Sequence, residues 1–148
     1  MILYCDTSAL IKLYLTETAS SALKKLAGSS EAVATCRVTW AEAHAALARR
    51  VREVPGDAAA ISEAKLALAS DWPKVMIVEL TQGLVERAAD YADTFALRGY
   101  DSVQLAAAHS LALEAVIEVT FACFDDRLSK AAKILGLRAP FGVAAGKP

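Results

Sequence analysis

Two patterns of apolar positions alternate along the chain. In the first, apolar residues follow one another directly, as in MILYC and VMIV; in the second, they recur every three or four positions. Runs of the first kind are typical of buried strands, and the second spacing has the period of an amphipathic helix. Strands are therefore predicted over residues 1–5, 32–36, 74–78, within 116–124 and, at a sheet edge, over 137–139. Helices are predicted over residues 7–14, 17–27, 39–53, 58–70, 82–97, 101–115 and 126–135.

Residues suited to helix ends stand at several of these boundaries. Asp6 and Thr81 precede helices, and their side-chain oxygens can accept hydrogen bonds from the first helical N–H groups. Gly28, Gly99 and Gly136 follow helices and can adopt the left-handed backbone that often ends one. These five residues predict where several of the helices begin and end.

The alternation of strands with helices determines the expected fold class. Strands connected through helices form a mainly parallel sheet that is covered by helices on both faces. Neither a repeat, a low-complexity segment nor a linker divides the sequence, so we expect one α/β domain over residues 1–140. The last residues, 141–148, include GVAAGKP and are expected to form a flexible C-terminal tail.

Composition supports a globular protein that is not in a membrane. Apolar residues make up 55% of the chain and charged residues 22%, which is ordinary for a folded domain. No apolar run has the length of a membrane-spanning helix. The start, MILYCD, lacks the basic flank and the long apolar stretch of a signal peptide, so we expect a cytoplasmic protein.

Cysteine usage gives no sign of a disulfide or zinc framework. Cys5, Cys36 and Cys123 cannot all pair within one chain, and none stands in a C-x-x-C spacing. All three lie near the ends of predicted strands, where reduced cysteine is a common small core residue.

The charge balance excludes a protein that coats nucleic acid by bulk attraction. The net charge is −1 and the pI is about 6.1. A nuclease is not excluded, because the local field of a site can differ from the total charge. Basic residues gather on predicted helices, where they are expected to form solvated faces; a role in binding substrate is considered for Arg49, Arg50 and Arg98.

Acidic residues stand at one edge of the predicted sheet. Asp6 follows the first strand, Glu42 lies in the first turn after the second, and Asp125 and Asp126 follow the fourth. Asp101 begins the helix that leads into the fourth strand. In open parallel sheets, sites form beyond the carboxyl ends of the strands. The sequence therefore predicts that these acids lie together.

Each acid also has a purely structural interpretation. Asp6, Asp125 and Asp126 would serve as helix caps, and Asp101 would complement the dipole of a helix N-terminus. These interpretations remain open for each acid by itself. They do not explain why four element ends on one edge all have acids.

Glu42 has the strongest structural alternative. Thr39-x-x-Glu42 spells a capping box, in which each side chain would bond the backbone N–H of the other. A helical wheel also places Glu42 opposite Trp40 and Leu47, which belong to the expected core face.

Several carboxylates at one place repel each other unless a cation neutralises them. Mg²⁺ and Mn²⁺ prefer oxygen ligands, can activate water and can stabilise a leaving oxygen, which suits phosphodiester hydrolysis. The sequence has no Ser-His-Asp set, no glycine-rich phosphate loop and no Cys/His group at metal-binding spacing.

Four blocks of the chain together resemble a known family. YCDTSALIKLY, TWAEAHAAL, LRGYDSVQLAAA and FACFDDRLSKAAKILGL are similar, in order and spacing, to the acidic blocks of PIN-domain proteins. Within that family they most resemble the VapC toxins of bacterial toxin–antitoxin pairs. The resemblance extends from Met1 to about Arg138.

The resemblance implies roles for individual residues. The family's four acids fall on Asp6, Glu42, Asp101 and Asp125, with Glu42 acting on the metal through water. The family's hydroxyl residue, which helps to hold the metal or its waters, falls on Ser8, or alternatively on Thr7; Asp126 is an additional nearby acid. Two positions depart from many relatives: Gln104 stands where they have His, and Cys123 where they have a small or hydroxyl residue.

The resemblance also implies a fold, an activity and partners. The implied fold is a three-layer α/β/α sandwich with a short, mainly parallel sheet. The implied activity is a Mg²⁺- or Mn²⁺-dependent endoribonuclease that leaves a 5′-phosphate and a 3′-hydroxyl. The implied partners are RNA, a second copy in a homodimer, and a cognate VapB-type antitoxin whose Arg often reaches the acids.

Two other functions are weighed against this one. A non-catalytic PIN-like module would bind RNA or a protein partner without hydrolysis, although the chain keeps all four acids. An aspartate-based phosphoryl-transfer protein would explain Asp6, but such a phosphatase needs an aspartate where Ser8 stands. A receiver-like domain would need a lysine after a late strand, and none closely follows the strand predicted within residues 116–124.

Overall fold

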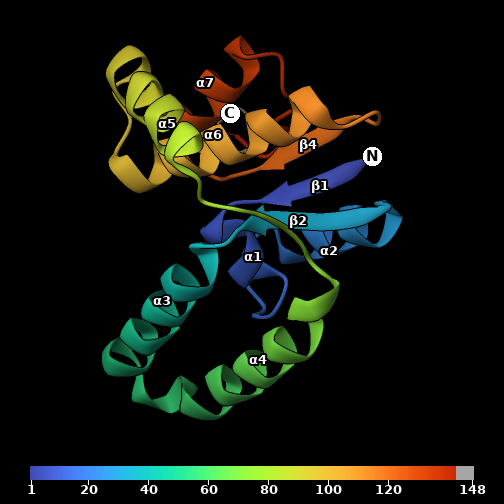
Figure 1. Cartoon of the computed structure of the whole chain (residues 1–148). Coiled ribbons are helices and arrows are strands. Elements are labelled where there is room, and N and C mark those ends of the chain that lie inside the picture. Colours follow the sequence, from blue (N-terminus) through green and yellow to red (C-terminus); the bar gives the residue numbers. More distant parts are fainter. Residues whose placement is uncertain (143–148) are drawn as a thin grey trace, which may run out of the picture.

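The computed structural model describes residues 1–142, and its sheet is entirely parallel. The four strands lie in the order β3-β2-β1-β4 (Figure 1). Their bounds are β1 (Ile2–Cys5), β2 (Ala32–Cys36), β3 (Met76–Val78) and β4 (Val119–Ala122). Most of the predicted tail, residues 143–148, lies outside the described part of the chain.

Helices cover both faces of the sheet, as the sequence predicts. The α-helices are α1 (Thr7–Lys12), α2 (Ser20–Ser29), α3 (Thr39–Glu53), α4 (Ala58–Asp71), α5 (Gln82–Phe95), α6 (Gly99–Glu114) and α7 (Asp126–Ile134). Two 3-10 turns, η1 (Pro55–Asp57) and η2 (Trp72–Lys74), flank α4. Helices α5, α6 and α7 lie on one face, α1 and α2 lie on the other, and α3 and α4 extend away from the sheet (Figure 1).

The alternation of side chains along β1 explains the three layers. Ile2 and Tyr4 pack into a core built with α5, α6 and α7. Leu3 and Cys5 point to the opposite face and pack with residues of α1, α2, α3 and α4. All four residues are buried, as expected for a central parallel strand that is covered on both faces. The predicted α/β fold class is confirmed.

The second helix is shorter at its start than predicted. It begins at Ser20, not at residue 17, because Ala19 has a left-handed backbone with φ 69°. The Ser20 hydroxyl donates to the Leu15 carbonyl at 2.9 Å and accepts from the Glu17 N–H at 2.9 Å, which fixes the preceding turn. Gly28 lies inside the helix and does not end it.

The other predicted glycine stops have different outcomes. Gly99 does not end α5; Ala96 takes the left-handed conformation there, with φ 54°, and Gly99 begins α6. Gly136 follows α7 with φ 88°, as predicted. Thr81 caps α5 by accepting from the Leu84 N–H at 3.2 Å, which confirms that cap.

Three other predicted ranges are longer than the observed elements. Helix α1 ends at Lys12 instead of Tyr14. Strand β3 begins at Met76, because residues 72–74 wind into η2 instead of extending. The expected edge strand 137–139 is only an isolated bridge, between Arg138 and Thr120.

The cysteines are core residues, as predicted. Cys5, Cys36 and Cys123 are buried and form no disulfide within residues 1–142. Burial raises the pKa of the Cys5 thiol above its usual range. None of the helices described has both the length and the apolar character needed to cross a membrane.

Candidate active site

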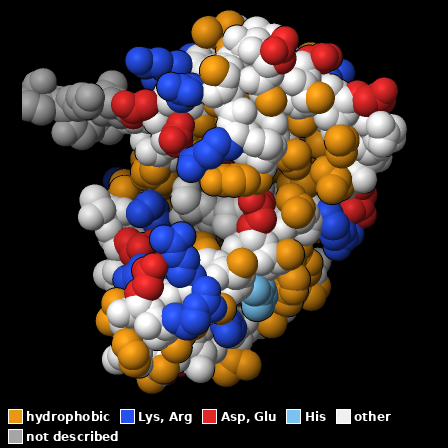
Figure 2. Space-filling model, turned by 90° about the vertical axis from the view of Figure 1, so that its left-hand side faces the viewer, with side chains coloured by type: hydrophobic (Ala, Val, Ile, Leu, Met, Phe, Trp, Pro, Cys, Tyr) orange, Lys and Arg blue, Asp and Glu red, His pale blue; other side chains and the backbone are white. Residues whose placement is uncertain are grey.

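A cavity of about 470 Å³ lies beyond the carboxyl ends of β1 and β4. The four acids of the predicted site all line it: Asp6, Glu42, Asp101 and Asp125. The other lining residues are Thr7, Ser8, Ile11, Ala46, Arg98, Tyr100, Gln104 and Phe124. Figure 2 views the molecule from the side to which the strands point and shows a hollowed face on which acidic and basic side chains lie close together. The fold therefore joins acids that are far apart in the sequence.

Asp6 is both a helix cap and a cavity residue. It follows β1, and its Oδ1 accepts from the Ala9 N–H at 2.9 Å and from the Ser8 hydroxyl at 2.9 Å. The residue as a whole is only 6% exposed. This burial raises its pKa from 3.8 to about 7, with smaller contributions from the charges of Asp101 and Glu42, while its hydrogen bonds oppose the rise. The capping interpretation is thus correct but does not exclude a chemical role.

Asp125 is built in the same way at the end of β4. It is the N-cap of α7, and its Oδ1 accepts from the Leu128 N–H at 2.9 Å. Asp126 is the first residue of α7 and is half-buried, but it does not line the cavity. The structure therefore separates the two neighbouring aspartates, of which only Asp125 faces the other acids.

The predicted capping box at Glu42 is wrong. Val38 is the N-cap of α3, and Thr39 is already helical and fully buried. Its hydroxyl interacts with Thr35 and Gln104 instead of with the helix backbone. Side chains from distant elements have replaced the local cap, which sequence spacing alone does not reveal.

Glu42 instead bonds two side chains from other helices. Its Oε1 accepts from the Thr7 hydroxyl of α1 at 2.9 Å and from Nε2 of Gln104 in α6 at 2.8 Å. The helical wheel treats this side of α3 as solvent-facing, but α1 and α6 cover it at the first turn. Glu42 is consequently half-buried and faces the cavity.

Asp101 is paired with a cation. Its Oδ2 accepts from Nε of Arg98 at 3.0 Å, and the aspartate side chain is 14% exposed against 66% for the arginine. The guanidinium carbon lies 5.2 Å from the centre of the Tyr100 ring. This hydrogen bond raises the pKa of Arg98, and Arg98 offsets part of the negative charge of the cavity.

The donor chemistry of the cavity fits a hard divalent cation. Its ligand atoms are carboxylate oxygens, which Mg²⁺ and Mn²⁺ prefer, and no cysteine or histidine lines it. In Asp6 and Asp125 the hydrogen bonds of the described residues engage only Oδ1. Within residues 1–142, however, no three acids converge closely enough to form a ready-made metal site. Binding a cation would therefore require the acids to approach one another, with Asp101 released from Arg98.

The three predicted substrate-binding arginines are not grouped. Arg98 lines the cavity, whereas Arg49 is exposed and pairs with Glu53 at 2.8 Å. Arg50 is held by Glu17 at 2.7 Å and by Asp57 at 3.3 Å, and it lines a different hollow. The structure thus brings only Arg98 to the acids.

Besides the apolar Ile11 and Ala46, three residues that line the cavity are absent from the predicted site. Tyr100 and Phe124 directly precede Asp101 and Asp125 in the sequence, a proximity that could have identified them. Gln104 lies one helical turn after Asp101 and is fully buried. Its contacts are to residues far away in the sequence, and these could not have been predicted from local spacing.

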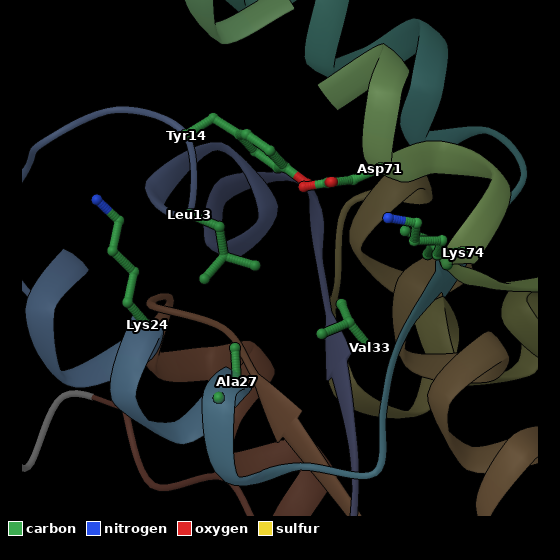
Figure 3. Close-up of a pocket in the computed structure, with 9 residues that line it drawn as sticks. Leu13, Tyr14, Lys24, Ala27, Val33, Asp71 and Lys74 are labelled. Carbon is green, nitrogen blue, oxygen red and sulfur yellow. The ribbon is translucent and has the colours of Figure 1, made fainter. Parts of the chain in front are cut away.

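A second hollow, of about 380 Å³, lies elsewhere between α1, α2 and β2 (Figure 3). Leu13, Ala27 and Val33 form its apolar wall. Its one carboxylate, Asp71, accepts from the Tyr14 hydroxyl at 2.8 Å. Because it does not gather acids, it lacks the chemistry of the first cavity.

Comparisons with known proteins agree with the geometry. Residues 3–134 match the family described as PIN domain. Two curated proteins from Mycobacterium tuberculosis are each 32% identical over 137 residues, which is 93% of this chain and 93% of theirs. They are named Ribonuclease VapC45 (strain CDC 1551 / Oshkosh) and Ribonuclease VapC49 (strain ATCC 25618 / H37Rv).

Solved structures share the fold at low sequence identity. VapC20 of Mycobacterium tuberculosis, described as a sarcin-ricin loop cleaving toxin, has a TM-score of 0.61 and 22% identity, and the match covers 87% of this chain and 94% of VapC20. VapBC2 from Rickettsia felis, bound to a promoter DNA fragment, has a TM-score of 0.60 and 12% identity over 94% and 97% of the two chains. FitAcB from Neisseria gonorrhoeae has a TM-score of 0.56 and 18% identity over 94% and 96%. The expected PIN-like layered architecture is confirmed.

Proposed function

This chain belongs to the PIN-domain family, and from that membership we propose that it is the ribonuclease toxin of a toxin–antitoxin pair. It cleaves RNA internally by hydrolysing phosphodiester bonds, with Mg²⁺ or Mn²⁺ bound among the acids of the cavity. The products have a 5′-phosphate and a 3′-hydroxyl. The family match leaves the phosphoryl-transfer hypothesis without support.

One observation supports this proposal above the others. Asp6, Glu42, Asp101 and Asp125 come from four separate segments of the chain and line the same cavity. Helix capping explains Asp6 and Asp125 individually, but it does not explain why both face Glu42 and Asp101. A shared cation explains the grouping, because it would neutralise carboxylates that otherwise repel each other.

Each acid has a proposed role towards the cation. Asp6, Asp101 and Asp125 would hold it directly, and Glu42 would act through a water molecule. When bound, Mg²⁺ or Mn²⁺ would supply the Lewis acidity that activates water and stabilises the leaving oxygen. Ser8 steadies Asp6 through its 2.9 Å hydrogen bond.

Thr7 and Asp126 have supporting roles. Thr7 steadies Glu42 in the same way that Ser8 steadies Asp6, through a hydrogen bond of 2.9 Å. Asp126 contributes negative charge near the cavity without ligating the cation. Neither residue is expected to contact the scissile phosphate.

The remaining lining residues suit an RNA strand. Arg98 is exposed enough to leave Asp101 and bind a phosphate oxygen of the substrate. Tyr100 is 52% exposed, so its ring can stack on an unpaired base, and the half-buried Phe124 adds apolar surface. Arg49 and Arg50 would contact more distant phosphates only after leaving their present ion pairs.

An antitoxin is the expected protein partner. Structural neighbours include VapBC2 of Rickettsia felis and a toxin–antitoxin complex from Klebsiella pneumoniae. A VapB-type antitoxin would block the cavity with a cationic side chain that binds the same carboxylates. We also propose that the chain forms a homodimer and acts on RNA in the cytoplasm. The DNA in the Rickettsia felis structure does not imply that this chain contacts DNA.

The function is tested by an RNA cleavage assay on the purified chain free of antitoxin. Cleavage with Mg²⁺ or Mn²⁺ should stop in EDTA and should be lost in Asp6→Asn. Asp126→Asn is the matched control. It makes the same change from aspartate to asparagine at a residue that does not line the cavity, so this variant should stay active. Cleavage that continues in EDTA, or that is unchanged in Asp6→Asn, would contradict the mechanism.

One observation favours a second candidate, a PIN-like module that binds RNA or a partner without hydrolysis. The acids are not gathered into a metal site within residues 1–142, and Arg98 already pairs with Asp101. Calorimetry with Mn²⁺ separates the two functions. A chain that binds RNA but neither binds Mn²⁺ nor cleaves RNA would be the module.

A further inference from the structure

Gln104 is the centre of a buried hydrogen-bond network beneath the acids. It lies in α6 and is 2% exposed. Its Oε1 accepts from the Tyr4 hydroxyl at 2.6 Å. Its Nε2 donates to Oε1 of Glu42 at 2.8 Å, to the Thr39 hydroxyl at 2.9 Å and, more weakly, to the Thr7 hydroxyl at 3.3 Å. One amide thus connects β1, α1, α3 and α6.

The Tyr4 hydroxyl determines which way the amide of Gln104 points. Tyr4 is fully buried, so its single O–H must donate to a protein acceptor, and Oε1 of Gln104 is that acceptor. The amide nitrogen is therefore directed to Glu42. The reverse orientation would set the amide oxygen against the carboxylate and would leave the phenol proton without an acceptor.

Glu42 needs such an anchor because its neighbours repel it. Glu42 lines the same cavity as Asp6, Asp101 and Asp125, so like charges lie near one another there. A half-buried glutamate near other carboxylates would rotate towards solvent if nothing held it. Gln104 and Thr7 both donate to Oε1 of Glu42, so the hydrogen bonds of the described residues leave Oε2 available.

We propose that Gln104 is a positioning residue, which holds Glu42 in the cavity and so makes cation binding and RNA hydrolysis depend on a glutamine that touches neither ligand. This inference rests on the proposed function for its catalytic part only. Its binding part concerns the acids and a divalent cation and can be measured without RNA.

The experiment measures Mn²⁺ affinity by calorimetry on the purified chain. Gln104→Leu removes both ends of the amide at similar size, and the dissociation constant should rise by about 10- to 100-fold. Gln104→His should recover most of the affinity, because a neutral imidazole can accept from Tyr4 with one nitrogen and donate to Glu42 with the other. Circular dichroism and thermal unfolding identify variants that are folded.

A double-mutant cycle separates positioning from a general effect on packing. In a Glu42→Gln background, Gln104→Leu should have almost no further effect on Mn²⁺ affinity, since the carboxylate it positions is gone. Tyr4→Phe is the second route if Gln104→Leu does not fold. It removes only the hydroxyl that orients the amide and should weaken Mn²⁺ binding several-fold.

RNA kinetics complete the test at saturating Mn²⁺. Gln104→Leu should lower kcat by about 10- to 100-fold with KM for RNA within about twofold of wild type. The inference is overturned if the Mn²⁺ affinity of Gln104→Leu stays within twofold of wild type, or if the wild-type chain binds no Mn²⁺. It is also overturned if Gln104→Leu lowers Mn²⁺ affinity by the same factor in the Glu42→Gln background as in wild type. A wild-type chain that binds Mn²⁺ but cleaves no RNA contradicts the proposed function. In that case the Mn²⁺ affinities of wild type and Gln104→Leu alone decide whether Gln104 positions Glu42.

Discussion

Arg98 donates its Nε–H to Oδ2 of Asp101 at 3.0 Å, so an exposed cation of this chain already occupies one of the acids proposed to bind metal. Three positions separate the two residues, and both line the cavity. A divalent cation bound as proposed would compete with Arg98 for this carboxylate. The guanidinium would then become available to a phosphate when Asp101 turned to the metal, which would link cation binding to substrate binding.

Removing Arg98 should have opposite effects on the two ligands. Arg98→Ala should tighten Mn²⁺ binding slightly, by about two- to fivefold, because an exposed ion pair contributes little. The same variant should raise KM for RNA by about tenfold, since a charge-assisted hydrogen bond to phosphate is lost. Calorimetry with Mn²⁺ and steady-state cleavage measure the two effects.

Arg37→Ala is the matched control for Arg98→Ala. Arg37 is also an exposed arginine bonded to a carboxylate, that of Glu79 at 2.7 Å, but it does not line the cavity. Its replacement should leave both constants unchanged. Equal effects of the two substitutions would mean that Arg98 acts only through net charge.

The raised pKa of Asp6 predicts that stability falls as pH rises when no divalent cation is present. Between its ordinary pKa of 3.8 and its folded value of about 7, the folded chain keeps a proton that the unfolded chain has lost. Burial of this carboxyl therefore lowers the free energy of unfolding most above about pH 7, where the group is ionised in both states. Below about pH 4, where the group is protonated in both states, burial has no such effect. In EDTA, Asp6→Asn should be more stable than wild type at pH 8, by up to about 4 kcal/mol, and equal to it near pH 4.

Urea unfolding at several pH values checks this prediction. Asp125→Asn is the control, because Asp125 caps a helix as Asp6 does and asparagine caps about as well as aspartate. Millimolar Mn²⁺ at pH 8 should stabilise wild type and not Asp6→Asn. If the difference in unfolding free energy between wild type and Asp6→Asn does not depend on pH, the pKa of Asp6 is not raised by folding and the prediction is wrong.

Tyr100 is predicted to bind RNA without taking part in the reaction. Its ring is exposed and lies beside Asp101, so Tyr100→Ala should raise KM by about 5- to 100-fold, the range for losing one base–aromatic stack. Mn²⁺ affinity should not change. Tyr100→Phe keeps the ring and should behave as wild type, and a KM that is insensitive to Tyr100→Ala would exclude the stacking.

The sequence revealed the acids because they belong to short, local signals. Asp6 directly follows the buried strand β1, Asp125 follows β4 after two residues, and the carboxyl ends of parallel strands meet at one edge. Expecting a parallel sheet was enough to place these two residues at the same edge, although the sequence did not predict that β1 and β4 are paired. The same logic extends to Glu42 and Asp101, which lie in the first turns of α3 and α6.

The network around the acids could not be predicted in the same way. Gln104 bonds Tyr4 across 100 positions and Glu42 across 62; the family resemblance marks it only as a departure from His, and no local pattern indicates these partners. The capping box failed for the same reason, since Gln104 and Thr35 engage Thr39 from outside its helix.

Two helix boundaries were missed because of backbone conformation. Ala19 and Ala96 adopt positive φ, which the sequence does not suggest for alanine. In both places the predicted helix end was wrong by a few residues. The acids were unaffected, because none of them lies at these two boundaries.

The hydroxyls of Ser8 and Thr7 are expected to act on different acids and can be distinguished by pH. Ser8 donates to Asp6 and lowers its pKa, so Ser8→Ala should raise the pH at which Mn²⁺ binding is half-maximal by about half a unit. Thr7 donates to Glu42, and Thr7→Val should weaken Mn²⁺ binding several-fold without moving that midpoint. Each variant is the control for the other, because both remove one hydroxyl from the first turn of α1. Calorimetry from pH 5.5 to 8.5 measures the midpoints; identical midpoints in all three chains would mean that Ser8 does not tune Asp6, and a shift in Thr7→Val alone would reverse the assignment.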